Sequence, residues 1–311
     1  MSDTTSCEAL AETLVELWAM QGRDGFLLSD PATARCEARE VLDAECGVSY
    51  RYLWMPYREM RGDVQELQRR GILNPDRDES KLFRDDRDPS GRHCFLCADN
   101  VAECHPMEML APLELAGRNY FAGANFAWIE PDHFTVMAAE HRDQSYSRHV
   151  LEAMVDLHRR TAGRFRVLFN GCGAGATIPW HLHYQITTTA MPIERLTLGC
   201  EAAYPTAVCR FDLGQGGIDT AHARSDQWLQ ANPQHHSLNI LVATIEGRET
   251  VFIFPRDQRH AQAEGKGLVG GFEVAGDFVL SAPTEEVTFK EGTAATARRI
   301  LTQVSPPAWS V

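Results

Sequence analysis

Hydrophobic residues recur at the spacing of a helix face in several parts of the chain. Near the N-terminus, leucines and a tryptophan recur at the spacing of one helix face, which predicts an amphipathic helix over residues 8–20. Residues 32–46 carry a weaker helical pattern, and residues 147–163 carry a strong one that ends at a glycine. A closing helix is predicted within residues 284–304, weakened at Gly292.

Short segments rich in aromatic and β-branched residues predict strands between and after these helices. They cover residues 119–126, 127–130, 134–138, 165–170, 181–189, 238–246, 250–254 and 278–281. The order is strands, a helix and strands, and then again strands and a helix. This order predicts an α+β fold of two related halves, each an antiparallel sheet with packed helices. The halves show no sequence repeat, so the duplication is inferred from the order of elements alone.

Residues 74–92 separate the first helices from this pattern. They are crowded with Asp, Arg, Pro and Ser, a composition typical of a solvated loop or linker. We therefore predict three parts: an N-terminal helical extension and linker over residues 1–80, a first half over residues 81–198, and a second half over residues 199–311.

The composition is that of an ordinary globular chain, since 44% of the 311 residues are hydrophobic and 23% are charged. A net charge of −13 argues against nucleic-acid binding through a basic surface. The only lysines are Lys81, Lys266 and Lys290. An anionic substrate would therefore be bound mainly by arginine, whose planar guanidinium binds phosphate with two parallel hydrogen bonds.

The chain carries no predicted targeting or membrane segment. Its first residues lack a basic region followed by an apolar core, and no apolar run is long enough to span a bilayer. Nine cysteines, an odd number scattered along the chain, favour free thiols in a reducing compartment. We therefore expect a cytoplasmic protein with no membrane partner, in which some of the thiols could hold a metal.

The segment with the clearest chemistry is His181-Leu-His183-Tyr-Gln185. On a strand, alternate side chains point to the same face, so the two histidines and the glutamine form one polar row. A neutral imidazole can attack an α-phosphate and hold the nucleotide covalently, which predicts ping-pong kinetics. His183, with a polar neighbour on each side, is the candidate nucleophile, and Gln185 could hydrogen-bond a phosphate oxygen. The alternative is that both histidines are ordinary half-buried strand residues.

A run of small residues, from Asn170 to Thr177, directly precedes this row. Glycines let backbone N–H groups come close to an anion, so the loop could hold the charge that builds on the phosphoryl oxygens. Gly171, Gly175 and Ala176 are candidate phosphate-binding positions, and Asn170 and Thr177 are candidate neutral donors. The alternative is that the glycines only mark a tight turn.

The motif Cys94-Phe-Leu-Cys97 has a spacing that is common to metal sites and redox sites. The surrounding sequence lacks the βαβ pattern of a thioredoxin-like protein, and zinc prefers four thiolate or imidazole ligands. The candidates to complete such a set are His133, His141, His181 and the pair Cys104-His105. Two buried structural thiols are the alternative.

In the second half, Phe254-Pro-Arg256 leaves a predicted strand, and Arg259 follows shortly after. Arginines at the end of a strand could clamp a phosphate or a sugar hydroxyl. Arg256 is therefore a further candidate for nucleotide binding, although a solvated loop explains the same segment equally well.

The stretch from Asn170 to Gln185, followed by Met191-Pro-Ile-Glu194, resembles the active-site segment of the histidine-triad superfamily. It is most similar to the nucleotidyltransferase branch, in which a glutamine replaces the last histidine. That branch includes galactose-1-phosphate uridylyltransferase, diadenosine tetraphosphate phosphorylase and GDP-hexose phosphorylases. The resemblance is strong over residues 92–194 and weak over residues 238–281. It implies nucleotidyl transfer or phosphorolysis with His183 as the nucleophile, and a second half that is degenerate.

Cys94-Phe-Leu-Cys97-Ala-Asp-Asn-Val resembles the zinc-binding segment of the galactose-1-phosphate uridylyltransferases. In that family the set is completed by a histidine of a Pro-Asp-His segment and by the first histidine of the His-x-His pair. The matching positions are His133 and His181. The resemblance therefore implies a structural zinc that braces the strand carrying His183.

These features predict an enzyme that moves a nucleoside monophosphate from a nucleotide sugar or a dinucleotide to phosphate or a sugar phosphate. His183 attacks, and Gln185 positions the α-phosphate. Two alternatives stay open, a hydrolase with the same nucleophile and a non-catalytic nucleotide sensor. The pattern does not specify the base, the sugar or the acceptor. By analogy with the superfamily, a homodimer is expected.

Overall fold

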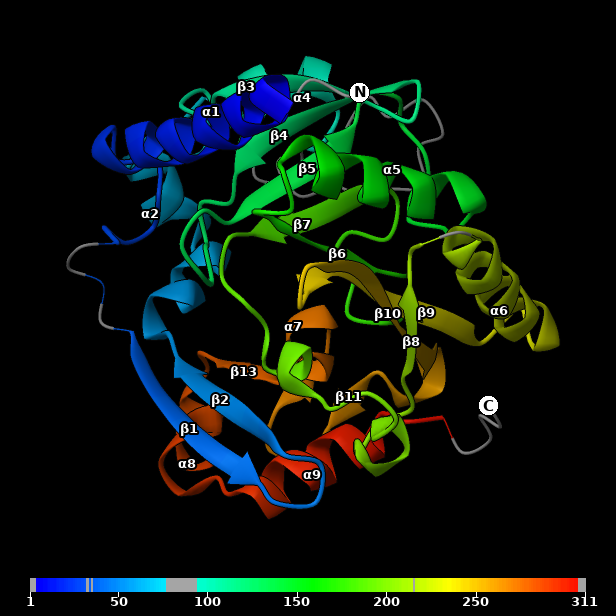
Figure 1. The fold of residues 1–311 in the computed structure, drawn as a ribbon. Coiled ribbons are helices and arrows are strands. Elements are labelled where there is room, and N and C mark those ends of the chain that lie inside the picture. The colour runs from blue at the N-terminus through cyan, green and yellow to red at the C-terminus, as the bar shows by residue number, and fades with distance from the viewer. Residues whose placement is uncertain (1–3, 32–33, 35, 77–93, 215, 307–311) are drawn as a thin grey trace.

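The computed structural model describes the chain except for residues 1–3, 32–33, 35, 77–93, 215 and 307–311 (Figure 1). Most of the predicted linker, and the predicted boundary between residues 80 and 81, lie outside the described residues. Within the part of the chain that the structure describes, no helix is long and apolar enough to cross a membrane.

One eight-stranded sheet forms the centre of the molecule, with all neighbouring strands antiparallel. The strand order is β3-β4-β5-β7-β6-β9-β10-β8. The strands are β3 (Leu110–Leu115), β4 (Arg118–Ala124), β5 (Phe134–Ala138), β6 (Arg166–Asn170), β7 (His183–Thr187), β8 (Cys209–Asp212), β9 (His236–Ile245) and β10 (Arg248–Asp257). Because β6 pairs with β9, with Asn170 opposite Asn239, the two predicted halves share one continuous sheet.

A second, three-stranded sheet joins the N-terminal part of the chain to its C-terminal part, in the order β1-β2-β13. Its strands are β1 (Glu37–Asp43), β2 (Val48–Trp54) and β13 (Asp277–Leu280), and β13 runs parallel to β2. A small hairpin consists of β11 (Gln262–Ala263) and β12 (Gly267–Leu268).

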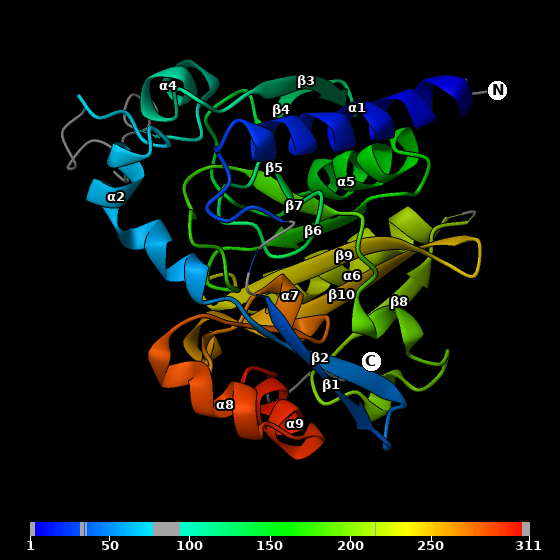
Figure 2. The ribbon, with the colours of Figure 1, turned by 90° about the vertical axis from the view of Figure 1, so that its left-hand side faces the viewer.

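Helices cover both faces of the large sheet. The α-helices are α1 (Thr4–Arg23), α2 (Val64–Arg69), α4 (Ala98–Cys104), α5 (Arg148–Arg160), α6 (Gly217–Ala231), α7 (Gly271–Val274), α8 (Glu286–Glu291) and α9 (Ala294–Gln303). Short 3-10 helices are η1 (Pro56–Gly62), η2 (Pro192–Arg195), η3 (Glu201–Ala203), η4 (Gln258–His260) and η5 (Pro283–Glu285). Figures 1 and 2 show α1 and α5 on one side of the sheet, and α8 and α9 with the small sheet on the other.

Each face of the large sheet has its own apolar core. On the side of α1 and α5, Tyr184 and Ile186 of β7 pack with the leucines and methionine of α5. On the other side, Leu168 of β6 belongs to a core that includes residues of β2, β13 and α9. Burying each such side chain contributes about 1.5–3 kcal/mol to folding. Gln185 pairs with Leu168, so the polar row of β7 faces this second core.

The predicted fold class is confirmed: an α+β chain with antiparallel sheets and packed helices, which begins with a helix. The predicted closing helix divides at Gly292, where α8 ends and the side chain of Thr293 accepts a hydrogen bond from Thr296 N–H to cap α9. The boundaries of the three predicted parts stay a prediction.

Two of the predicted elements are wrong. Residues 37–43 form β1 rather than the middle of a helix, because their backbone pairs with β2 along the whole strand. Residues 127–130 form a turn rather than a strand. There, Asn125 Oδ1 accepts the N–H of Ala127, and Arg58 donates to the carbonyl oxygens of Ala127 and Trp128, so side chains take the place of a neighbouring strand.

Candidate functional site

His183 begins β7 and is buried, with 4% of its surface exposed. Its Nδ1 lies 2.8 Å from the carbonyl oxygen of His181, so Nδ1 carries the proton and donates it. Nε2 therefore has a free lone pair, and it has no hydrogen-bond partner among the described residues. Burial lowers the pKa of His183 to about 4, so the ring is neutral at pH 7. This is the form of imidazole that attacks phosphorus.

Gln185 lies on the same face of β7, between Thr135 of β5 and Leu168 of β6. Its Oε1 is buried without a partner, and so is Nε2 of His133. Nδ1 of His133 accepts the N–H of Ile129 at 3.0 Å, which leaves the proton on Nε2. Burial lowers the pKa of His133 to about 3, and an interaction with Gln185 opposes this lowering. The two side chains are thus close enough to interact, but they are not aligned for a full hydrogen bond.

The loop that follows β6 packs against the second half of the chain. A Cβ atom at Gly175 would lie 2.3 Å from Cα of Gly270, and φ of Gly175 is +92°, so only glycine fits there. The backbone N–H groups of Gly175, Ala176 and Thr177 make no hydrogen bond within the described ranges of the chain. Unbonded N–H groups of this kind can bind an anion, and that role stays a prediction for this loop.

Asn170 is held by hydrogen bonds that fix which way its amide points. Its Oδ1 accepts the N–H of Gly271 and the Nδ2 group of Asn239, both at 2.7 Å. Asn239 also donates to the carbonyl oxygen of Ala174 at 2.6 Å and accepts from Nη1 of Arg256. With Oδ1 of Asn170 occupied twice, its Nδ2 group is left to donate to a ligand.

Arg256 itself is completely buried, and its Nη2 donates to the carbonyl oxygen of Val269 at 3.0 Å. Burial lowers its pKa to about 10, so the guanidinium stays charged at neutral pH. Nε has no partner among the described residues. Asn239 thus links Arg256 to Asn170, because it accepts a hydrogen bond from the guanidinium and donates one to Oδ1 of Asn170.

Cys94, Cys97, His141 and His181 form a cluster whose ligand atoms all lie within 4.8 Å of one another. Nδ1 of His181 lies 3.3 Å from Sγ of Cys94 and 3.6 Å from Sγ of Cys97, and Nδ1 of His141 lies 3.3 Å from Sγ of Cys97. Tetrahedral zinc with two thiolates and two imidazoles requires sulfur–nitrogen separations of about 3.6 Å. This donor set therefore fits a zinc ion.

The surroundings of this cluster favour metal binding as well. Nε2 of His181 lies 2.9 Å from the carbonyl oxygen of Ala138 and donates to it, which leaves Nδ1 free as a ligand atom. A hydrogen bond with Cys97 and the neighbouring His181 lower the pKa of Cys94, which favours the thiolate form that binds a metal.

This cluster differs at one position from the metal set that the family resemblance implies. His141, one of the candidates that the spacing left open, lies in the cluster, and His133 lies outside it. The reason is the strand between them: His133 precedes β5 and His141 follows it. Five residues of strand span about 16 Å. His181 contacts Ala138, the last residue of β5. His141 follows that end of the strand and lies close to His181, whereas His133 lies at the opposite end.

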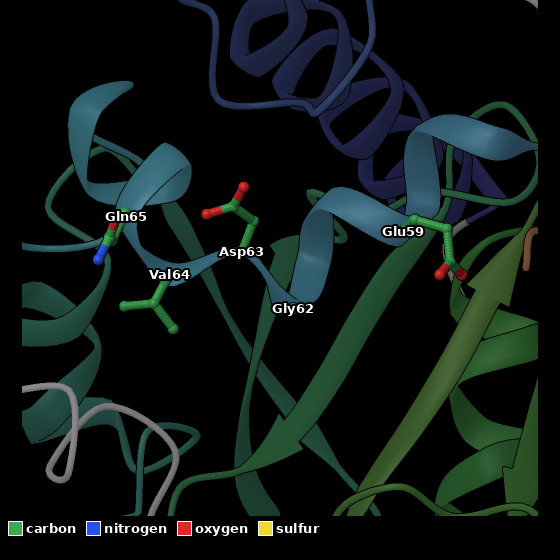
Figure 3. A pocket seen from close by; sticks show the side chains of 5 residues that line it. All are labelled: Glu59, Gly62, Asp63, Val64 and Gln65. Atoms are coloured by element: carbon green, nitrogen blue, oxygen red, sulfur yellow. The ribbon is translucent and has the colours of Figure 1, made fainter.

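A surface hollow of about 600 Å³ lies elsewhere, at the junction of η1 and α2 (Figure 3). It is lined by Glu59, Gly62, Asp63, Val64 and Gln65. Asp63 caps α2 by accepting the N–H of Glu66, and Glu59 accepts from the Ser281 hydroxyl, so both acids have structural partners. None of the residues predicted for the site lines this hollow.

Comparison with known proteins places the fold. A family described as a domain of unknown function, DUF4922, matches residues 51–188, which include the metal-ligand cluster and the polar row. The yeast Ap4A phosphorylase Apa2 in complex with AMP superimposes with a TM-score of 0.62 over 96% of each chain, at 15% sequence identity. The fold is shared with Ap4A phosphorylase.

Further structures of the same phosphorylase agree. In complex with Ap4A it gives a TM-score of 0.59 at 12% identity, over 97% of this chain and 99% of that chain. A third structure gives 0.56 at 14% identity, over 94% of this chain and 98% of that chain. A search of curated proteins finds no match. At these identities the likeness to Ap4A phosphorylase shows the fold alone, because proteins that share a fold can differ in function.

Two residues of the site were not found from the sequence. Asn239 donates a hydrogen bond to Asn170, and the side chain of Gln144 bonds to the backbone of Asn170 and of His183. Asn239 had a local signal, because it is a lone polar residue in the apolar run Leu238–Leu241 of β9. Gln144 lies in an irregular segment and carries no such signal.

Proposed function

We propose that this protein is a nucleotidyltransferase that forms a nucleotidyl intermediate on His183. The donor is a dinucleotide or a nucleotide sugar, and the acceptor is phosphate or a sugar phosphate. One observation carries the proposal. Nδ1 of His183 donates to the carbonyl oxygen of His181, which leaves the lone pair of Nε2 free, and the loop after β6 has three backbone N–H groups without a partner among the described residues.

The reaction has two steps. In the first, Nε2 of His183 attacks the α-phosphorus, a P–N bond forms, and the P–O bond to the leaving group breaks with its electron pair. The Nδ1 proton stays on the ring, and the carbonyl oxygen of His181 stabilises the positive charge that develops there. In the second, an oxygen of the acceptor attacks the same phosphorus and the P–N bond breaks, which restores the neutral imidazole.

Neutral donors would stabilise the charge on the phosphoryl oxygens. The N–H groups of Gly175, Ala176 and Thr177, the Nδ2 group of Asn170 and the side chain of Gln185 are the candidates. Gly171 leads into this loop and is kept close to Ser237, where a Cβ atom would approach the hydroxyl to 2.4 Å. Arg256 would act through Asn239 rather than by direct contact with phosphate.

The structural comparisons favour a dinucleotide as the donor. The yeast phosphorylase that shares this fold is an Ap4A phosphorylase and was solved with AMP and with Ap4A. The sequence resemblance to uridylyltransferases and GDP-hexose phosphorylases supports a nucleotide sugar as the second candidate.

Zinc is the proposed metal, with Cys94, Cys97, His141 and His181 as its ligands. It would supply a rigid four-ligand anchor rather than chemistry at the phosphorus. Through His181, this anchor would fix the carbonyl oxygen that holds the Nδ1 proton of His183.

Product analysis tests the proposal. The protein is incubated with Ap4A and with UDP-, GDP- and ADP-sugars, each without an acceptor, with phosphate and with hexose phosphates, and the nucleotides are separated. We expect nucleoside diphosphate to form only when phosphate is present. Release of nucleoside monophosphate at the same rate without phosphate would identify a hydrolase. Tight binding without turnover of any donor would identify a sensor, and either result would overturn the proposal.

A further inference from the structure

Gln144 lies between β5 and α5 and is 1% exposed. The chain enters this segment at the metal-ligand cluster, since His141 is three residues earlier. Its backbone N–H donates to the carbonyl oxygen of Pro179 at 3.0 Å, so the residue is fixed to the segment that leads into β7. The buried side chain of Gln144 therefore lies next to the segment that carries His181 and His183.

The side-chain amide of Gln144 makes three hydrogen bonds, all to the backbone of the candidate site. Nε2 donates to the carbonyl oxygen of Asn170 at 2.8 Å and to that of His183 at 2.9 Å. Oε1 accepts the N–H of His183 at 2.7 Å. Both donors of the amide are used, and its oxygen is bonded, so its orientation is fixed.

These bonds lie where β6 and β7 separate. The two strands pair from Arg166 opposite Thr187 to Leu168 opposite Gln185. Continued by two residues, this register would set Asn170 opposite His183. Instead, the amide of Gln144 bridges the backbone of these two residues. The strands are thus held apart by one side chain at the position of the candidate nucleophile and of the residue before the glycine loop.

We infer that Gln144 is a positioning residue that sets the distance between Nε2 of His183 and the donors of Asn170 and its loop. The inference rests on the proposed function, because the distance matters only if phosphorus is attacked between these groups. Gln144 itself need not contact the nucleotide. It acts through the backbone of the two residues that the reaction uses.

The chain offers a matched control for the loss of a buried glutamine. Gln21 is also fully buried, and its amide also bridges backbone groups: Nε2 donates to Met107 O and Oε1 accepts from Met109 N–H, both at 2.9 Å. It joins α1 to the segment before β3, away from the polar row. Both methionine variants therefore remove side-chain hydrogen bonds to the backbone, two at Gln21 and three at Gln144, but only Gln144→Met changes the candidate site.

The experiment compares these two variants with the wild type. Thermal unfolding, zinc content, kcat, KM and the single-turnover rate of adduct formation are measured with Ap4A and phosphate. We expect both variants to unfold at lower temperature and both to keep their zinc. Gln144→Met should lose about 100-fold in kcat with a smaller change in KM, since a misplaced nucleophile costs about this factor. Gln21→Met should keep its kcat.

Gln144→Glu provides a second route if the methionine variant does not fold. It keeps the shape and an acceptor for the N–H of His183, but it faces two carbonyl oxygens with a carboxylate oxygen, so the strands should separate further. Slow adduct formation in this variant supports the inference. If folded Gln144→Met and Gln144→Glu both match Gln21→Met in kcat, the inference is overturned. If the wild type forms no adduct and turns over no donor, the proposed function fails, and the inference fails with it.

Discussion

Asn239→Ala is the substitution whose effect the structure specifies most completely. Asn239 is 1% exposed, and its side chain accepts from Nη1 of Arg256 and donates to Asn170 Oδ1 and Ala174 O. Removing it leaves a buried guanidinium and a buried carbonyl oxygen with fewer partners. It also removes one of the two bonds that orient the amide of Asn170, so it should affect both stability and reaction.

The magnitude follows from the bonds lost. Two neutral hydrogen bonds contribute about 1 kcal/mol each, and one to a charged group contributes about 1.5–3 kcal/mol. Their sum is about 3.5–5 kcal/mol. We expect a loss of about 3 kcal/mol, because Asn170 Oδ1 keeps the bond from Gly271 N–H. A chain of this size loses about 2–3 °C in Tm per kcal/mol, so Tm should fall by about 6–9 °C.

Urea and thermal unfolding measure the loss of stability, and the single-turnover rate of adduct formation measures the effect on the site. That rate should fall by about tenfold, because an amide that is held by one hydrogen bond instead of two positions its donor less precisely. Asn74→Ala is the control, since the side chain of Asn74 makes two hydrogen bonds to backbone groups outside the polar row, to Glu103 O and from Asp76 N–H. An Asn239→Ala protein with wild-type Tm and wild-type adduct formation would refute the reasoning about the Asn170–Asn239–Arg256 chain.

Three further outcomes are expected. His141→Ala should lose the bound zinc, whereas His133→Ala should keep it, which metal analysis of the purified variants decides; zinc loss from the second alone would reinstate the sequence-based set. Gly175→Ala should lower Tm and slow adduct formation, because a Cβ atom there meets the backbone of Gly270 at a positive φ, a strain of about 1–3 kcal/mol; an unchanged Tm would contradict it. Gln185→Glu should slow adduct formation about 100-fold, since the carboxylate would repel the phosphate. If Gln185→Asn slows adduct formation to the same rate, charge repulsion is not the cause.

The local parts of the site were predictable from the sequence. His183 and Gln185 share one face of β7, as strand alternation predicts, whereas His181 precedes the strand and lies in the Cys/His cluster. The glycine run predicts a loop because glycine tolerates positive φ, which Gly175 adopts. Both depend on neighbouring residues only. The predicted helix over residues 32–46 failed for the opposite reason. Its residues have high helix propensity, but β1 is stabilised by β2 and, through it, by β13, which is contributed from the far end of the chain.

The fourth metal ligand depended on tertiary geometry. Sequence spacing could not show which of His133 and His141 lies near the Cys94–Cys97 motif. In the structure the two histidines lie at opposite ends of β5, so they are apart by the length of that strand. Asn239 and Gln144 were missed because a hydrogen-bond partner more than twenty residues away leaves no periodic pattern in the sequence. Asn170 lies 69 residues from Asn239 and 26 from Gln144, and His183 lies 39 from Gln144.

The central claim is a covalent bond between Nε2 of His183 and an α-phosphorus. The most direct measurement is mass spectrometry of the protein quenched during turnover of Ap4A, with the modified peptide mapped under alkaline conditions that preserve a P–N bond. We predict an added mass of one nucleoside monophosphate on the peptide containing His183, and no added mass on the His183→Ala protein. An adduct that still forms in His183→Ala, or that maps to another residue, would contradict this account.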